Sequence, residues 1–113
     1  MVPGGIRFPM LSDPGGRIGA LYGVYDARQR IDLRGHVVID PEGIVQAMEV
    51  LAAPIGRNVA ELLRQLRSLQ HHARTGEFMP CGWQPGKPTL PKREDAGAIP
   101  GKVWEIWKPR NAF

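Results

Sequence analysis

The first part of the chain combines a short stretch at helical spacing with a polar stretch of no clear period. Three apolar side chains recur at positions i, i+3 and i+4 and predict a short helix over residues 17–22: Ile18, Leu21 and Tyr22. Residues 13–16 (DPGG) are typical of a turn before this helix, and Gly23 is expected to end it. Residues 25–31 are polar, and we expect an irregular surface loop there.

The middle of the chain predicts a β-hairpin. Residues 36–40 (HVVID) are typical of a buried strand, residues 41–43 (PEG) of a tight turn, and residues 44–51 of a second strand. Apolar side chains occupy both faces of each strand, which is typical of strands that are covered on both sides. We therefore expect further layers to pack on both faces of this hairpin.

One long amphipathic helix is expected after the hairpin. Asn58 is a natural N-cap with Glu61 three residues later, as in a capping box, and Gly76 is a typical C-terminal stop. A single apolar stripe runs along this helix: Val59, Leu62, Leu63, Leu66, Leu69 and Ala73. The opposite face is expected to be largely solvated: Arg64, Gln65, Arg67 and Ser68.

The last part of the chain is expected to be an extended tail. Residues 79–113 hold six of the eleven prolines, which forbid a continuous helix and spoil a central strand. Within this tail, Trp83 is expected to anchor the chain against the body, and residues 103–107 (VWEIW) are expected to dock on a surface, that of a partner subunit. We thus expect a compact part over residues 1–78 and a tail over residues 79–113.

Composition and charge narrow the classes of function. A chain of 113 residues suffices for one small domain, its one cysteine excludes an internal disulfide framework and a cysteine-cluster zinc site, and no apolar run reaches the length of a membrane span. The N-terminus lacks the pattern of a secretory signal, and with the lone thiol this favours the cytoplasm. The net charge of +4 is uneven, with −1 over residues 1–56 and +5 over residues 57–113. No set of aromatic side chains is interleaved with the basic ones, so a nucleic-acid partner is not favoured.

Four segments taken together resemble the peroxiredoxin family, and the resemblance covers about residues 6–90. They are residues 8–14 (FPMLSDP), residues 34–44 (RGHVVIDPEGI), residues 55–58 (IGRN) with the leucine-rich helix that follows, and residues 76–86 (GEFMPCGWQPG). The similarity is greatest to the typical two-cysteine type, which includes the peroxidase subunit of alkyl hydroperoxide reductase. It implies an α/β, thioredoxin-like fold, of which this chain is the C-terminal portion: a hairpin, one long amphipathic helix and an extended tail.

The resemblance also implies a site. Arg34 matches the arginine that holds the peroxidatic thiolate and the peroxide oxygens, a task suited to the fixed donor fork of a guanidinium. Arg57 matches a second arginine behind the active site. Cys81 lies two residues after the usual resolving position, which Met79 occupies, so its role as the resolving thiol stays open. Each has a plain alternative: two surface arginines, beside a strand and an N-cap, and an incidental thiol in the tail.

The histidines are expected to be structural. His71 and His72 are adjacent on the predicted helix and point about 100° apart, so they do not favour one shared zinc ion. His36 begins the predicted strand and is expected to be a hydrogen-bonded histidine of the core or the sheet edge. Neither a metal nor an organic cofactor is implied.

The predicted function is that of a thiol peroxidase, which reduces hydrogen peroxide and alkyl hydroperoxides through a cysteine sulfenic acid. In the family that the chain resembles, a thioredoxin-like or flavoprotein reductase restores the thiol, and the enzyme is a homodimer or larger. The peroxidatic residue is expected upstream of residue 1, as cysteine or as a selenocysteine whose codon reads as a stop, so the chain alone is expected to be inactive. The alternative is a non-catalytic, dimerising interaction module.

Overall fold

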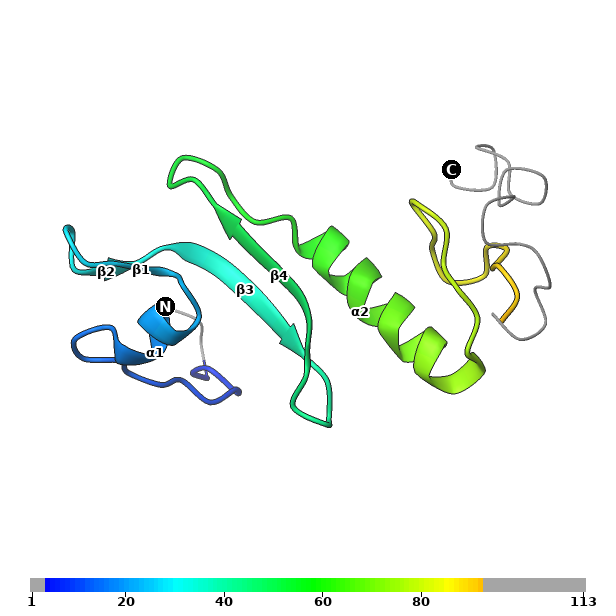
Figure 1. Cartoon of the computed structure of the whole chain (residues 1–113), viewed down its shortest axis with the longest axis horizontal. Helices are drawn as coiled ribbons and strands as arrows, with labels where there is room; N and C mark the ends of the chain where they lie inside the picture. The colour runs from blue at the N-terminus through cyan, green and yellow to red at the C-terminus, as the bar shows by residue number, and fades with distance from the viewer. Residues whose placement is uncertain (1–3, 93–113) are drawn as a thin grey trace. The chain divides into compact units, whose positions relative to one another are not determined.

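The computed structural model describes residues 4–92 and divides the chain into two compact units, one up to Arg57 and one from Asn58 onward. The first unit contains the short helix α1 and four strands, and the second contains the long helix α2 and the segment after it (Figure 1). The expected boundary between residues 78 and 79 stays a prediction. The expected docking of residues 103–107 lies outside the described residues.

Helix α1 spans Arg17–Leu21, so the predicted short helix is confirmed to within one residue. Its N-terminus is capped from outside the helix, because the Asp13 carboxylate accepts hydrogen bonds from the backbone N–H groups of Ile18 at 2.9 Å and Gly19 at 2.8 Å. These bonds, that of Gly19 first, lower the pKa of Asp13 below its usual value. Gly16 has φ 69°, and a Cβ there would collide with the ring of Tyr25, so glycine lets the chain enter the helix at this point.

The polar stretch expected to be an irregular loop is instead a small antiparallel pair. Strands β1 (Tyr25–Asp26) and β2 (Ile31–Asp32) pair in the register Tyr25↔Asp32 and Asp26↔Ile31. The turn between them is built by Asp26, whose carboxylate accepts from the backbone N–H groups of Arg28 at 2.8 Å and Gln29 at 3.0 Å. The hydrogen bonds of Asp26 therefore stabilise a turn that pairs β1 with β2, although the apolar residues of this stretch show no strand period.

The predicted hairpin is confirmed, with an earlier start. Strand β3 spans Arg34–Ile39 and pairs antiparallel with β4, Val45–Leu51, in a register that sets Arg34 opposite Leu51. The sequence pattern placed the start at His36, because Arg34 and Gly35 are not apolar and only pairing with β4 makes them strand residues. In the turn, Asp40 accepts from the backbone N–H of Ile44 at 2.8 Å, and this bond lowers the pKa of Asp40.

Apolar side chains on the hairpin are half-buried rather than buried within this chain. Ile39 is 45% exposed, Val45 50% and Met48 46%. The layers expected on both faces are not complete within the first unit, where α1, β1 and β2 leave these side chains in partial contact with water. Ile39 pairs with Val45 and Val37 pairs with Met48, and Val37 and Ile39 are two residues apart on β3, so these partly exposed apolar groups share one face of the hairpin.

The second unit is built on α2, which spans Val59–Thr75 and confirms the predicted long helix. The Asn58 side chain accepts from the backbone N–H of Glu61 at 3.1 Å, and Gly76 ends the helix with φ 72° and a bond to the carbonyl of His72 at 2.7 Å. Parts of the apolar stripe remain exposed, among them Val59 at 63%. In the described part of the chain no helix is long and apolar enough to cross a membrane.

The segment after α2 is fixed to the helix by Trp83. This side chain is 2% exposed, its ring lies 5.1 Å from that of His71, and its Nε1–H donates to the carbonyl of Lys87 at 2.9 Å. The expected anchoring role of Trp83 is thus confirmed. Phe78 and Leu90 form an isolated antiparallel bridge, so the chain from residue 79 to residue 92 runs as turns around a buried indole.

Candidate functional site

Two of the three expected site residues meet at one end of the hairpin. Arg34 is the exposed first residue of β3, and Arg57 follows β4 in the same unit. The Arg57 guanidinium donates from Nη1 to the carbonyl oxygen of Gly35 at 3.1 Å, so it binds the backbone directly next to Arg34. The structure therefore brings these two positive charges to the same end of the β3–β4 pair.

Gly35 allows a close approach of the two strands at this point. A Cβ on Gly35 would lie 2.7 Å from the backbone oxygen of Glu49 on β4, closer than real Cβ contacts. Only a residue without a side chain fits there unless the strands separate. The backbone that carries Arg34 is therefore held by its approach to β4 on one side and by Arg57 through the Gly35 carbonyl.

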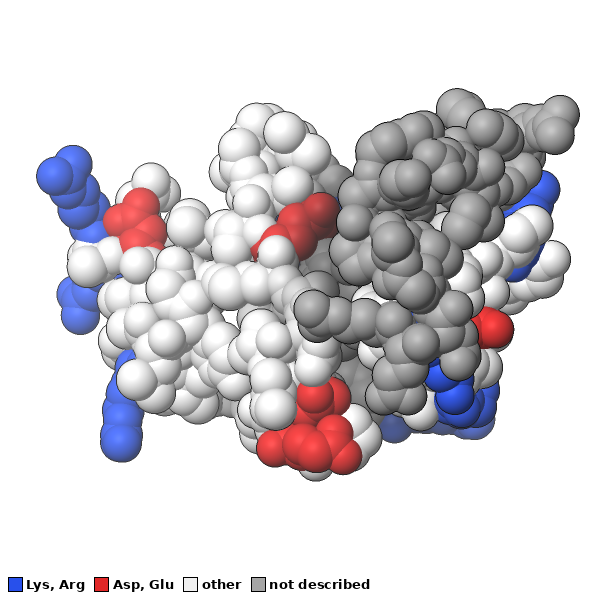
Figure 2. All heavy atoms as spheres, turned by 45° about the vertical axis from the view of Figure 1, so that its right-hand side comes forward, with Lys and Arg blue, Asp and Glu red and all other residues white. Residues whose placement is uncertain are grey.

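The guanidinium of Arg34 is free to bind an anion. Within residues 4–92 it forms no hydrogen bond or ion pair, which leaves its donors to solvent or a ligand. The opposite end of the hairpin carries the acidic turn residues Asp40 and Glu42, and Figure 2 shows acidic side chains gathered there. The hairpin is thus basic at its open end and acidic at its tip.

Cys81 belongs to the second unit. It is a free, exposed thiol in the turn between Pro80 and Trp83. The pKa of Arg64 in the same unit is raised, mainly by its hydrogen bond to Glu61. The exposure of the thiol leaves it accessible to a reaction partner in solution.

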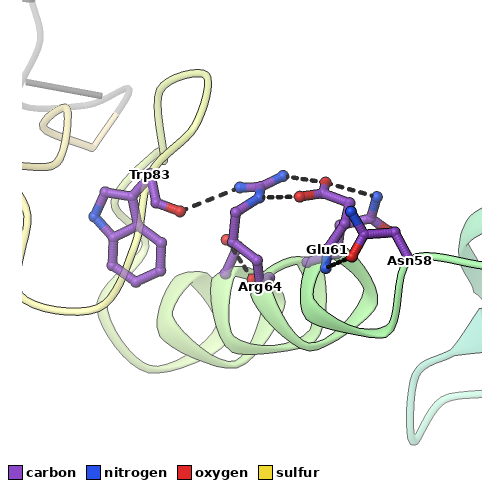
Figure 3. Close-up of polar contacts among 6 residues, drawn as sticks. Asn58, Glu61, Arg64 and Trp83 are labelled. Carbon is purple, nitrogen blue, oxygen red and sulfur yellow. Dashed lines mark hydrogen bonds and ion pairs between the residues drawn. The ribbon is translucent and has the colours of Figure 1, made fainter. Parts of the chain in front are cut away.

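A network on α2 is the feature that the sequence pattern missed. Arg64 and Gln65 were expected on the solvated face, but both are half-buried and both bind Glu61 (Figure 3). Arg64 donates to the two Glu61 oxygens at 2.7 Å each and to the carbonyl of Trp83 at 3.3 Å. The spacing of Glu61, Arg64 and Gln65 at i, i+3 and i+4 indicates the contacts among these side chains on the helix. No local sequence pattern indicates the hydrogen bond from Arg64 to Trp83.

This network borders a groove of about 360 Å³ on the second unit. Its lining comes from the first turns of α2 and from the turn after Trp83: Asn58, Ala60, Glu61, Leu63, Arg64, Arg67, Gln84 and Pro85. The Arg64 guanidinium, and then the Gln65 amide, lower the pKa of Glu61 from 4.5 to about 2. Glu61 is therefore a carboxylate at neutral pH and neutralises Arg64.

The two adjacent histidines of α2 both contact Glu77, one at its carboxylate and one at its backbone carbonyl. His71 Nε2 lies 2.9 Å from a Glu77 carboxylate oxygen, and His72 Nδ1 lies 2.7 Å from the Glu77 backbone carbonyl. Thr89 donates to the same carboxylate at 2.9 Å. Among the residues that the structure describes, no group of three or more His, Cys, Asp or Glu side chains is placed to hold a metal ion.

The structure contradicts the prediction for His36. The ring was expected to be hydrogen-bonded, but both ring nitrogens are buried without a hydrogen-bond partner. Its Nδ1 lies 3.5 Å from Glu49 Oε2, an ion-pair distance that lacks hydrogen-bond geometry. The expectation is wrong because the residue opposite His36 on β4 offers a carboxylate at contact distance and no aligned acceptor.

Similarity to known proteins identifies the family. Residues 3–48 match the AhpC/TSA family, and residues 68–108 match the C-terminal domain of 1-Cys peroxiredoxin. The whole chain aligns at 48% identity with 55% of the selenocysteine-containing peroxiredoxin PrxU of Peptoclostridium acidaminophilum. The chain belongs to the peroxiredoxin family. Across 82% of its length it is also 36% identical to 48% of the peroxiredoxin TSA1 of Saccharomyces cerevisiae.

Solved peroxiredoxins share the fold. The reduced 2-Cys peroxiredoxin of Plasmodium vivax aligns over 70% of this chain and 40% of its own, with a TM-score of 0.67 and 40% identity. AhpC of Enterococcus faecalis aligns over 66% of this chain and 45% of its own, with a TM-score of 0.62 and 35% identity. The fold is therefore α/β and thioredoxin-like, with short strands and one long helix. This peroxiredoxin chain spans about half the length of the curated relatives it matches.

Proposed function

We propose that the chain carries the arginine site of a thiol peroxidase that reduces hydrogen peroxide and alkyl hydroperoxides. The observation that carries this proposal is the free guanidinium of Arg34, held at the start of β3 beside Arg57. Membership of the peroxiredoxin family supports the reaction class. A guanidinium at this place stabilises a thiolate against protonation and neutralises the charge that develops on a leaving oxygen.

The reaction needs a nucleophile, which we place in sequence upstream of these residues. The thiolate sulfur attacks the terminal oxygen of the hydroperoxide, the O–O bond breaks, and the sulfur is oxidised to a sulfenic acid. The other oxygen leaves as an alcohol or water after it takes up a proton. The 48% identity to a peroxiredoxin named for its selenocysteine supports an upstream cysteine or selenocysteine in this role.

Regeneration requires thiols. A resolving thiol condenses with the sulfenic acid to form a disulfide and water, and a dithiol reductant then reduces that disulfide. Cys81 is exposed and therefore accessible for the first step, whereas the match to the 1-Cys C-terminal domain supports an external thiol. We propose a thioredoxin-like or flavoprotein reductase as the partner, a homodimer or higher oligomer as the assembly and the cytoplasm as the location.

A second candidate function is a non-catalytic interaction module. The half-exposed apolar side chains on one face of the hairpin, such as Ile39 and Met48, favour it because they offer surface to another chain. This module would bind through its strands and would need no nucleophile. This interaction module would give no functional role to the free Arg34 guanidinium.

Two measurements separate the candidates. The upstream DNA of an enzyme is expected to encode, in frame, a Pro-x-x-x-Thr-x-x run followed by TGC or by TGA for selenocysteine. Peroxide consumption with thioredoxin and its reductase is then expected for the extended protein and not for the 113-residue chain. Turnover by the 113-residue chain that depends on Cys81 would make that thiol the nucleophile and overturn the proposal. An extended protein without turnover would favour the interaction module.

A further inference from the structure

His36 is a buried ring with unused nitrogens. Its side chain is 14% exposed, and neither ring nitrogen has a hydrogen-bond partner. The nearest ionisable partner is Glu49, which lies directly opposite on β4 with Oε2 at 3.5 Å from Nδ1 and is 38% exposed. Buried nitrogens without a partner are costly and call for an explanation.

Arg34 lies on the same face of the hairpin as this pair. Side chains two residues apart point to the same face of a strand, so Arg34 and His36 share one face of β3. Leu51 is opposite Arg34 and Glu49 is opposite His36, which makes Glu49 the diagonal neighbour of Arg34. Long side chains reach each other across such a diagonal.

Glu49 therefore has two basic side chains within the reach of its own. Arg34, His36 and Glu49 are the only ionisable side chains in β3 and β4, and Arg57 from the following loop is occupied by the Gly35 carbonyl. In the structure Glu49 lies against His36, and Arg34 forms no ion pair within the described residues.

We propose that Glu49 is a positioning residue shared between His36 and Arg34, and that protonation of His36 frees Arg34 to bind an anion. When His36 is neutral, Glu49 turns to Arg34, pairs with its guanidinium and neutralises it. When His36 is protonated, Glu49 pairs with the imidazolium and Arg34 is released. The inference rests on the proposed function only in assigning the anion at Arg34 to the peroxidase reaction.

The test is nuclear magnetic resonance on the 113-residue chain, with the Arg34 Nε–Hε signal recorded at about pH 5.5 and about pH 8, on the two sides of the range in which histidine changes charge. We expect the signal to move between these two pH values in the wild type. The movement is expected to be lost in Glu49→Gln, which keeps the shape of the side chain, and in His36→Leu. It is expected to persist in Glu42→Gln, a matched loss of one charge in the exposed turn.

The outcomes are decisive without any peroxide. A signal that does not move in the wild type, or that moves equally in Glu49→Gln, overturns the inference. A movement kept in His36→Leu assigns the response to another group and also overturns it. The amide signals of β3 and β4 report whether each variant keeps the hairpin, and Glu49→Gln decides the matter if His36→Leu does not fold. Because no peroxidatic residue takes part, failure of the proposed peroxidase function leaves this result unaffected.

Discussion

Arg57 donates a hydrogen bond from its guanidinium to the backbone carbonyl of Gly35, at 3.1 Å, and so fixes the backbone at the residue after Arg34. The two arginines have different tasks in this arrangement. Arg34 presents a free guanidinium, whereas Arg57 stabilises the backbone from which Arg34 extends. Loss of either is therefore expected to affect peroxide reduction, but to different extents.

Arg57→Ala is expected to lower the second-order rate of peroxide reduction about tenfold in the protein extended by its upstream sequence. The lost bond to the Gly35 carbonyl is an exposed, charged hydrogen bond of about 1.5 kcal/mol, which corresponds to about one factor of ten. Stopped-flow measurement of peroxide reduction checks this value. Arg28→Ala removes an arginine from the turn between β1 and β2 and is the matched control. Equal rates for Arg57→Ala and the control would contradict the positioning role.

Gly35→Ala is expected to destabilise the 113-residue chain by about 1–3 kcal/mol, the usual cost of forcing extra atoms into a packed site. The new Cβ would lie 2.7 Å from the backbone oxygen of Glu49, and a backbone atom of a paired strand does not move aside easily. Urea denaturation measures the change. Gly56→Ala is the control, because a Cβ at Gly56 meets nothing within 4 Å. A variant of Gly35 as stable as that of Gly56 would show that the strands do not need this close approach.

The network of Glu61 on α2 makes a prediction about acid stability. The bonds from Arg64 and Gln65 lower the pKa of Glu61 from 4.5 to about 2. A carboxyl group with a lower pKa in the folded state stabilises the fold above its unfolded pKa, and this contribution is lost as the pH falls from about 4.5 toward 2. Because the Glu61 side chain is 38% exposed, solvent screening limits the contribution to less than about 1 kcal/mol.

Unfolding at neutral pH and at about pH 3 measures this contribution. Glu61→Gln is expected to lose less stability between the two pH values than the wild type does. The other carboxylates with lowered pKa values, Asp13, Asp40 and Glu77, remain in both proteins and cancel in the comparison. Glu42→Gln serves as the control, and a pH dependence of Glu61→Gln identical to that of the wild type would rule out the contribution.

Elements with their own capping signals could be predicted from the sequence. Helix α2 begins at Asn58 and ends at Gly76 as its local pattern indicates, because both caps act within one turn. Strand β3 begins earlier than its apolar pattern because Arg34 and Gly35 become strand residues only through pairing with β4. The bond from Arg64 to Trp83 joins residues 19 apart, and no local spacing encodes such a contact.

The site could be predicted in part. The resemblance placed Arg34 and Arg57, and the structure brings them to one end of the hairpin. It did not indicate the pair of His36 and Glu49, because cross-strand partners follow from the register, which the turn at Asp40 and a bulge between Val38 and Ile39 together determine. Cys81 could be located in an exposed turn, and its resolving role stays a prediction.

The resolving role of Cys81 is expected to produce a disulfide between subunits. In the extended protein, treatment with peroxide is expected to give a covalent dimer on a non-reducing gel, because the exposed thiol can reach the sulfenic acid of a partner subunit. Cys81→Ser is expected to remain monomeric on the same gel. If the wild type also remains monomeric, an external thiol resolves the sulfenic acid and Cys81 has no such role.

The second-order rate of peroxide reduction by Arg34→Ala, measured in the extended protein, tests the central claim most directly. Loss of one preorganised charge donor is expected to lower this rate by about 10²–10³-fold. Arg34→Lys is expected to recover only part of it, because lysine keeps the charge without the planar fork of donors. A rate for Arg34→Ala equal to that of the wild type would contradict the claim that Arg34 holds the reacting thiolate and peroxide.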